Sequence, residues 1–361
     1  MMTTDIQAIQ PGLTPQKGDA FFLTPSCILG SFSPAIEPLI TAVYRLLGIR
    51  GREDNGPPES QATCCSGILF HGDVITLEST LMVVARLWHV AAEAGFDSVT
   101  TACVTSFGVH QECLEILEND PETATQIDRC LKQSIGRTLI FPKRVLHASD
   151  VFYMYRKQIA ELLKYRLVDK ETGRKLNVVD HVGCHYSKLF PHKAIGGMAF
   201  CEVLTGPIVA WGGAEVDYPE RLHCCGMGFR QCMVQPNRGY TMACVLKKMR
   251  SMAPYKPDLI LTNCPGCNQF LDKEQWAIWK MTRESYFIPV LNYAELAGLL
   301  LGFDPYEQVG IQCHSVPVEP LLDKIGIPYN RAFYLCNKSS SDDRSSDIHN
   351  TLNQPRAGEI S

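Results

Sequence analysis

The segment Asn263-Cys264-Pro265-Gly266-Cys267 places two cysteines three residues apart at the end of an apolar run. The adjacent pair Cys224-Cys225 ends 39 residues before Cys264, and a single Cys184 lies 40 residues before Cys224. Thiolates bind soft metals, so five of them at such intervals predict a metal centre. We call this set the second ladder: Cys184, Cys224, Cys225, Cys264 and Cys267.

The first half of the chain repeats this pattern with one change. Cys27 is followed 37 residues later by the pair Cys64-Cys65, and Cys103 lies 38 residues after Cys65. The position that matches Cys267 is Ser106. A cysteine pattern written twice at nearly equal spacing predicts a duplicated metal-cluster module. We call the four cysteines Cys27, Cys64, Cys65 and Cys103 the first ladder.

Composition excludes several classes of protein. The chain has 361 residues, of which 45% are hydrophobic and 20% charged, so it is long and apolar enough to form two hydrophobic cores of ordinary size. Its net charge is −4. The sequence has no stripe of basic residues, so we expect neither nucleic acid nor an anionic membrane as a partner. We also expect no secretory signal and no membrane span, because no segment has the required apolar pattern. Disulfide-rich secreted scaffolds are usually short. The sixteen cysteines therefore predict metal binding in a reducing, cytoplasmic setting.

Hydrophobic patterns predict an α/β fold with two similar domains. Strand-like apolar runs end at the first and the last cysteine positions of both ladders, and segments whose apolar residues have helical spacing follow them. Such alternation predicts a small, mainly parallel sheet flanked by helices in each half, with the metal sites at the strand ends. The strand-like runs are 21–28, 98–104, 176–184 and 258–264, and the helical ones are 34–47, 78–94 and 238–252.

The domain boundaries follow from the same patterns. We expect a flexible N-terminus at 1–19, domains at 20–170 and 171–336, and a disordered polar tail at 337–361. Residues 145–150 and 290–295 are expected to open the closing helix of each domain, and the first domain carries extra residues near 119–136.

The adjacent cysteine pairs indicate the type of metal centre. Mononuclear zinc sites prefer spaced pairs, whereas neighbouring thiolates suit a larger cluster in which each sulfur meets a different iron. Five thiolates also exceed the four that a regular [4Fe–4S] cube uses. Gly226, after the second pair, leaves room for the backbone to approach a cluster.

The motifs Cys224-Cys225-Gly226, Asn263-Cys264-Pro265-Gly266-Cys267 and Pro289-Val290-Leu291-Asn292 resemble the duplicated cysteine-rich CCG domains of the heterodisulfide reductase B subunit. The resemblance covers roughly residues 20 to 330 and extends to the related complexes of sulfur oxidation. It implies one noncubane [4Fe–4S] cluster per domain, a disulfide substrate cleaved between the clusters, and all five cysteines of the second ladder as ligands of one cluster.

The first ladder departs from the family pattern. The resemblance implies Cys27, Cys64, Cys65 and Cys103 as ligands, but Ser106 replaces the fifth and Ser66 stands where the family has glycine. Three alternatives stay open: a regular [4Fe–4S] cube on four thiolates, a cluster with Ser106 oxygen as fifth ligand, and, disfavoured by the adjacent pair, zinc.

His185, which follows Cys184 directly, is a candidate proton donor to a departing thiolate, with hydrogen bonding to sulfur or backbone as the alternative. The chain shows no flavin fingerprint and no ferredoxin cysteine run. The resemblance therefore implies two partners, a ferredoxin-like iron–sulfur protein and a flavin-binding protein of the same complex. The expected function is an oxidoreductase component that reduces or forms a disulfide or sulfane-sulfur bond.

Two other functions fit this pattern. Related CCG proteins transfer electrons in hydroxyacid- or succinate-oxidising complexes without substrate chemistry of their own. A zinc-stabilised scaffold that only assembles a complex is the third alternative.

Overall fold

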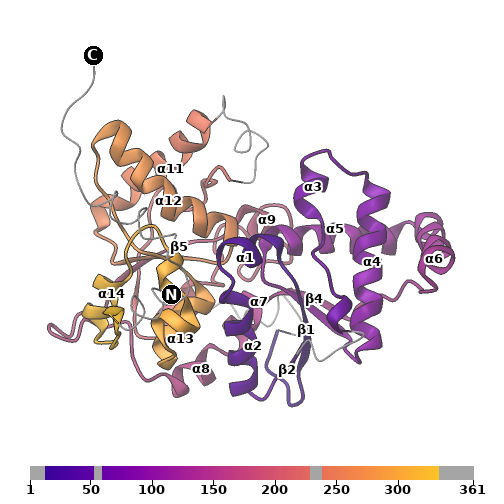
Figure 1. Ribbon diagram of the computed structural model, residues 1–361, viewed down its shortest axis with the longest axis horizontal. Helices are drawn as coiled ribbons and strands as arrows, with labels where there is room; N and C mark the ends of the chain where they lie inside the picture. Colours follow the sequence, from indigo (N-terminus) through magenta and orange to yellow (C-terminus); the bar gives the residue numbers. More distant parts are fainter. Residues whose placement is uncertain (1–12, 53–58, 228–237, 333–361) are drawn as a thin grey trace. The chain divides into compact units, whose positions relative to one another are not determined.

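The computed structural model describes residues 13–52, 59–227 and 238–332 (Figure 1). Met1–Ile327 forms one compact unit that contains both ladders, and Pro328–Ser361 forms another, which is described only as far as residue 332. Most of the expected flexible N-terminus and the whole expected tail at 337–361 lie outside the described residues.

The first half contains a four-stranded parallel sheet in the order β2-β1-β3-β4. Its central strands are buried, as the side chains of Phe21, Phe22 and Val99 show. Parallel strands of this kind are apolar because helices cover both faces of the sheet. Buried parallel strands of this kind place their carboxyl ends at one edge. The strands are β1 (Ala20–Thr24), β2 (Arg50–Gly51), β3 (Ser98–Thr101) and β4 (Arg144–His147).

Helices flank this sheet, and the longest two, α4 and α5, pack with α6. The apolar stripe of α4 buries Leu81, Val84 and Trp88 against the core. The helices are α1 (Cys27–Phe32), α2 (Ile36–Leu46), α3 (Gly67–His71), α4 (Leu77–Glu93), α5 (Val104–Asn119), α6 (Pro121–Ile135), α7 (Ala148–Met154) and α8 (Arg156–Leu162), with a 3-10 turn, η2 (Glu59–Gln61).

The second half repeats the architecture. Its parallel sheet has the order β6-β5-β7-β8, which matches the first sheet strand for strand. The strands are β5 (Asn177–His181), β6 (Ala214–Glu215), β7 (Leu259–Thr262) and β8 (Val290–Asn292). The helices and turns are α9 (Cys184–Ser187), α10 (Thr205–Ala210), α11 (Arg238–Met252), η5 (Ala253–Tyr255), α12 (Pro265–Thr282), α13 (Tyr293–Leu301), η6 (Pro305–Val309), η7 (Ile311–Cys313) and α14 (Glu319–Ile325).

The predicted α/β class with two small parallel sheets is confirmed. One local prediction was wrong. Residues 145–147 and Val290–Asn292 do not open helices but belong to the last strand of each sheet, paired with β3 and β7. These strands are short and run directly into α7 and α13, so the apolar pattern alone does not separate strand from helix. The extra residues near 119–136 contain α6.

Polar and aromatic contacts join the two halves of the unit. The Tyr186 hydroxyl donates a hydrogen bond to Asp150, and Asn263 Nδ2 donates to Ser149 Oγ at 3.3 Å. The rings of Phe107 and Tyr186 lie 5.2 Å apart between centroids. Because these side chains are buried, the ends of the two sheets are held against each other near both ladders.

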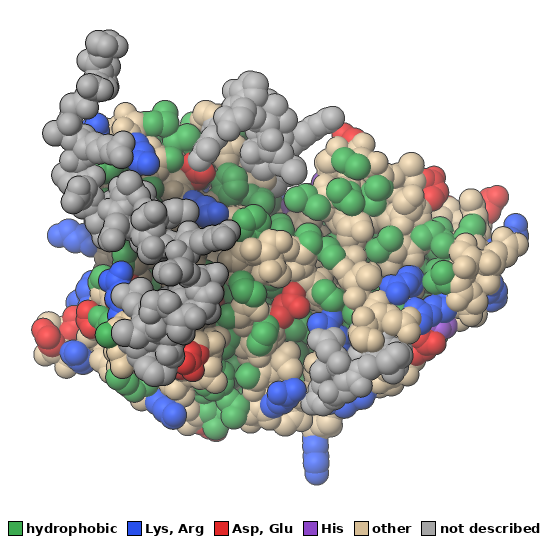
Figure 2. Space-filling model, in the orientation of Figure 1, with side chains coloured by type: hydrophobic (Ala, Val, Ile, Leu, Met, Phe, Trp, Pro, Cys, Tyr) green, Lys and Arg blue, Asp and Glu red, His purple; other side chains and the backbone are tan. Residues whose placement is uncertain are grey.

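The face drawn in Figure 2 carries charges of both signs. On the face drawn in Figure 2, Lys and Arg side chains alternate with Asp, Glu and apolar groups, and the coloured residues form no continuous basic stripe. Among the described helices, none combines the length and the hydropathy needed to cross a bilayer.

Candidate metal centres

The two ladders begin and end at equivalent places in the two sheets. Cys27 and Cys184 open short helices just after β1 and β5, and Cys103 and Cys264 cap α5 and α12 just after β3 and β7. Cys103 has φ −125° and ψ 127°, and Cys264 has φ −117° and ψ 124°. The carboxyl ends of neighbouring parallel strands therefore bring the first and last rungs of each ladder together.

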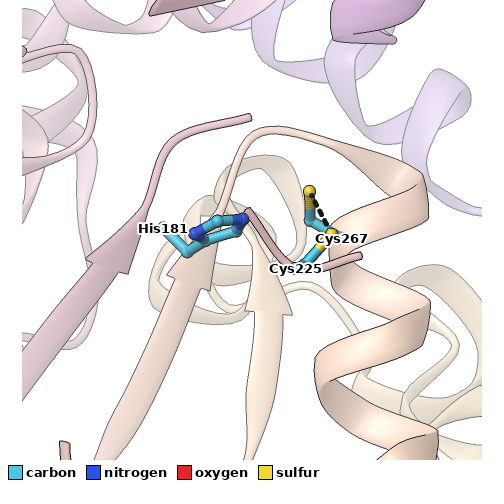
Figure 3. A group of neighbouring side chains, drawn as sticks. All are labelled: His181, Cys225 and Cys267. Carbon is cyan, nitrogen blue, oxygen red and sulfur yellow. Dashed lines mark hydrogen bonds between the residues drawn. The ribbon is translucent and has the colours of Figure 1, made fainter. Parts of the chain in front are cut away.

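The thiols of the second ladder converge. The sulfurs of Cys225 and Cys267 lie 3.2 Å apart (Figure 3). Hydrogen bonds from Cys184 and Cys225 lower the pKa of Cys224 to about 2. A hydrogen bond from Cys267 likewise lowers the pKa of Cys264. All five cysteines are free thiols, and each lies within electrostatic reach of others in the set.

His181 adds a ring to this group. Its closest ring nitrogen lies within 4.8 Å of the sulfurs of Cys225 and Cys267, and Figure 3 shows the ring at the end of β5 beside both cysteines. The side chain is buried, and burial lowers its pKa well below the usual value for histidine. Neither ring nitrogen has a hydrogen bond of full geometry to the described residues, although the backbone of Arg221 lies close enough to act on the pKa of the ring.

The first ladder converges in the same manner. Hydrogen bonds from Cys27 and Cys65 lower the pKa of Cys64 to about 2, the same effect seen at Cys224. Burial, followed by the charge of Cys264, raises the pKa of Cys103 to about 12. Each ladder thus combines thiols of lowered pKa with thiols of raised pKa, and the latter must release their protons when a metal binds.

Ser106 and Ser66 occupy the positions that the sequence comparison between the halves assigned to them. Ser106 is 2% exposed, and its hydroxyl lies beside the Cys65 thiol. A hydrogen bond with Cys64 and burial raise the pKa of Cys65 well above its usual value, and the Ser106 hydroxyl opposes that shift. Ser66 has φ +61°, and Gly226, its counterpart in the second half, has φ +89°. Both pairs are therefore followed by a left-handed residue, and in the first half the next amide, that of Gly67, points back at Cys65 Sγ.

Backbone amides point at the sulfurs in both halves. The N–H of Gly226 donates to Cys224 Sγ at 3.3 Å, and the N–H of Gly67 donates to Cys65 Sγ at 3.4 Å. Amides at the start of α12 lower the pKa of Cys264, and those at the start of α5 act on Cys103. Soft thiolates that accept backbone hydrogen bonds are the donor set that iron–sulfur clusters use, so the residues present fit such a group.

The two ladders lie close to each other. The charge of Cys264 acts on Cys103, and a Cβ placed on Gly183 would come within 3.0 Å of Cys264 Cβ and 2.6 Å of Val104 Cγ2. His185 lies at the same junction, with Nδ1 3.1 Å from Thr105 Oγ1 of the other half. Burial lowers the pKa of His185 to about 4, whereas negative charge at Cys224 opposes that shift.

Two polar residues at the site were not identified from sequence. Asn263 accepts a hydrogen bond from the N–H of Gly183 at 2.9 Å and so fixes the residue before Cys184. Lys248 is fully buried on α11, and its charge acts on Cys225 and Cys267. Asn263 precedes a ladder cysteine, which was a usable signal. The adjacent Lys247-Lys248 pair gave none, because only the fold decides which lysine is buried.

Comparisons with known proteins bear on these sites. The cysteine-rich CCG domain family matches residues 178–272, which include the whole second ladder. The chain is 26% identical over 310 residues to the B subunit of ferredoxin:CoB-CoM heterodisulfide reductase from Methanosarcina acetivorans, with 84% of this chain and 95% of that protein aligned. It is 27% identical to the 8-methylmenaquinol:fumarate reductase membrane anchor subunit of Wolinella succinogenes, over 83% and 97% of the two chains.

A solved structure supports the fold alone. The crystal structure of a hypothetical protein from Helicobacter pylori superposes with a TM-score of 0.59 at 12% identity, covering 87% of this chain. This chain spans 56% of the length of that protein. Taken with the two convergent ladders, the sequence matches show that the chain is a homologue of the heterodisulfide reductase B subunit and carries a cysteine-rich CCG domain.

Proposed function

We propose that the chain is the iron–sulfur catalytic subunit of a heterodisulfide-reductase-like complex. The observation that carries this proposal is the convergence of nine free ladder thiols at the carboxyl ends of two matching sheets. The names of the relatives support an oxidoreductase that acts on sulfur groups and works within a multi-subunit complex.

The second ladder is the proposed holder of a noncubane [4Fe–4S] cluster. Cys184, Cys224, Cys225, Cys264 and Cys267 supply five sulfurs, one more than a regular cube uses. The burial of Cys225, Cys264 and Cys267 (all at most 7% exposed) supports a protected group there. When bound, such a cluster supplies single electrons to a substrate sulfur.

The first ladder is the proposed holder of a second [4Fe–4S] cluster. Cys27, Cys64, Cys65 and Cys103 are its ligands in this proposal. The buried Ser106 hydroxyl beside Cys65 is available as a fifth, harder ligand, and a four-thiolate cube without Ser106 is the alternative.

The proposed reaction is the two-electron reduction of a disulfide, or its reverse. One S–S bond breaks, two electrons and two protons are taken up, and two thiols leave. His185 is the proposed proton donor, because it follows Cys184 directly, its ring lies at the junction of the two ladders, and negative charge at Cys224 raises its pKa against the effect of burial. The substrate is a small-molecule disulfide or sulfur carried on a protein.

The electrons must come from other proteins of the complex, since neither ladder resembles a flavin or ferredoxin motif. We propose two partners in the cytoplasm, a ferredoxin-like iron–sulfur protein and a flavin-binding protein. Co-purification of the tagged chain from its host checks this assignment. Recovery of the chain without any iron–sulfur or flavin protein would contradict it.

Metal analysis of the full chain purified without oxygen tests the central proposal. We expect iron and acid-labile sulfide in both halves and an EPR spectrum that changes on addition of a disulfide substrate. Cys264→Ser is expected to remove the signal of the second ladder, whereas Cys113→Ser, a buried thiol outside both ladders, keeps it. If the protein contains only zinc after reconstitution with iron and sulfide, the proposal is wrong and a zinc-stabilised scaffold is supported. The zinc ligands would then include His181, Cys225 and Cys267.

Ser106 variants separate the alternatives for the first ladder. Four thiolates suffice for a cube, so we expect Ser106→Ala to keep the iron of the first ladder. Ser106→Cys is expected to change the EPR spectrum of that site, because it restores a fifth thiol beside Cys65. Loss of iron in Ser106→Ala but not in Ser106→Cys would instead identify the serine oxygen as a required ligand.

A second candidate function is electron transfer without substrate chemistry in a hydroxyacid- or succinate-oxidising complex. The similarity to a component of 8-methylmenaquinol:fumarate reductase, over 83% of the chain, favours this candidate. Addition of disulfide substrates distinguishes the two, because a protein that only transfers electrons keeps its EPR spectrum unchanged while still accepting electrons from a reduced dye.

A further inference from the structure

The surroundings of the two ladders differ in charge although the sheets match. Lys248 lies 23 residues after Cys225, and the residue 23 positions after Cys65 is Trp88. Both side chains are at most 1% exposed, on α11 and α4, the helices that precede β7 and β3. Counted back from Cys264 and Cys103 instead, Lys248 matches Leu87, which is also buried, so either count pairs the buried cation of one half with an uncharged side chain in the other.

Lys248 is held by neutral groups. Its ammonium donates hydrogen bonds to the carbonyl oxygens of Glu220 at 2.6 Å and Arg221 at 3.2 Å, and lies 5.1 Å from the ring centroid of Tyr218. Burial lowers its pKa to about 8, and the charges of Cys225 and Cys267 oppose that shift. The side chain therefore remains charged at neutral pH.

The nearby carboxylates are occupied by other cations. Asp180 accepts two hydrogen bonds from Arg221, at 2.7 Å and 3.0 Å. The Glu220 side chain pairs with Lys247 at 3.0 Å. The positive charge of Lys248 acts on the thiolates of Cys225 and Cys267 as well as on the carboxylate of Asp180, at a buried place where water screens it little.

The corresponding position of the first half is neutral. Trp88 Nε1 donates a hydrogen bond to His110 Nδ1 at 3.0 Å, and both side chains are buried. Burial lowers the pKa of His110 to about 4, so the ring is uncharged at neutral pH. A cluster at the first ladder would therefore have a neutral Trp–His pair where the second has an ammonium group.

We propose that Lys248 is a positioning residue that raises the reduction potential of the second ladder's cluster and offsets the negative charge of its fifth thiolate, which the first ladder lacks. This inference rests on the proposed function, because it requires iron at the second ladder. The physical reason is that reduction adds negative charge, which a fixed buried cation stabilises.

Redox titration of the holoprotein followed by EPR tests the inference. At the potential where the wild-type second-ladder cluster is half reduced, Lys248→Met is expected to lower its reduced-to-oxidised ratio about tenfold, which is about 59 mV for a one-electron couple. The first-ladder signal serves as an internal reference and should not move. Cys103→Ser and Cys264→Ser assign the signals to their ladders.

Two variants serve as matched controls. Lys247→Met removes the neighbouring lysine, whose side chain is 54% exposed, and should leave the ratio within about twofold of wild type. Lys248→Arg keeps the charge and should do the same. A change below about twofold in Lys248→Met with iron intact, or an equal change in Lys247→Met, overturns the inference.

Loss of iron has a separate meaning. If Lys248→Met and Lys248→Gln lose second-ladder iron while Lys248→Arg keeps it, the charge is needed for assembly and the tuning role is overturned. If the wild type itself holds no iron, the proposed function fails instead, so the two failures are distinguishable.

Discussion

The buried carboxyl group of Asp150 is expected to make the stability of the folded protein depend on pH. Asp150 is 1% exposed; burial raises its pKa to about 7, although hydrogen bonds from Tyr186 and from the N–H of His147 act in the opposite direction. The folded state therefore holds a proton on Asp150 that the unfolded chain has already released. Its contribution is present at low pH and is lost as pH rises from the unfolded value towards about 7.

We expect Asp150→Asn to remove this dependence. Between about pH 4 and about pH 7, the free energy of unfolding of the wild type should fall relative to that of the variant, because unfolding releases the Asp150 proton only in the wild type. Urea unfolding of the holoprotein under argon measures both curves. Parallel curves would contradict the assigned pKa, and Asp97→Asn, at a side chain 64% exposed, is the control expected to follow the wild type.

For single residues, the spacing of the cysteines predicts which of them bind metal, but the sequence does not predict which residues contact each other in the fold. The equal spacing of the two ladders corresponds to equal positions in the fold, because the cysteines follow the ends of strands or lie in the loops that connect them to helices. The Tyr186–Asp150 hydrogen bond and the burial of Lys248 both depend on residues far apart in sequence. No local sequence pattern predicts such contacts.

Among the elements, the closing helices α7 and α13 show the duplication most directly. Each begins with a reciprocal cap: His147 with Asp150, and Asn292 with Glu295. The side chain of Asn292 accepts from the N–H of Ala294 at 3.0 Å, and Glu295 accepts from the N–H of Asn292 at 2.7 Å. These bonds satisfy amides that the first turn of a helix leaves free.

Removal of this cap should destabilise α13. Asn292→Ala is expected to lower the free energy of unfolding by about 0.5–2 kcal/mol, because a buried amide loses its acceptor. Asn292→Ser keeps a capping oxygen and should stay within about 0.5 kcal/mol of wild type. Equal losses in both variants, measured by urea unfolding, would show that packing rather than capping fixes the start of this helix.

The element scale also explains why the last strands were missed. Residues 145–147 and Val290–Asn292 are short runs directly before a cap, and a helical pattern follows without a break. Their pairing with β3 and β7 depends on strands far away in sequence, so only the assembled sheet reveals them. The central strands were predicted because longer apolar runs and the ladder cysteines mark their ends.

For the whole molecule, the close approach of the halves at Gly183 is the sensitive point. A methyl group there would lie 2.6 Å from Val104 Cγ2, which belongs to the other half. We expect Gly183→Ala to cost about 1–3 kcal/mol by overpacking and to lower the iron content, because Cys184 and Cys264 both adjoin the crowded contact. Gly30→Ala, where nothing lies within 4 Å, is the matched control and should keep both stability and iron.

The 3.2 Å separation of the Cys225 and Cys267 sulfurs has a practical consequence for anyone who handles this protein. If metal is stripped in air, oxidation needs little movement to join these two atoms covalently, and the joined pair can no longer accept iron. Exposure to oxygen would then lock the molecule in an inactive form that added iron and sulfide cannot rescue until a thiol reductant reopens it.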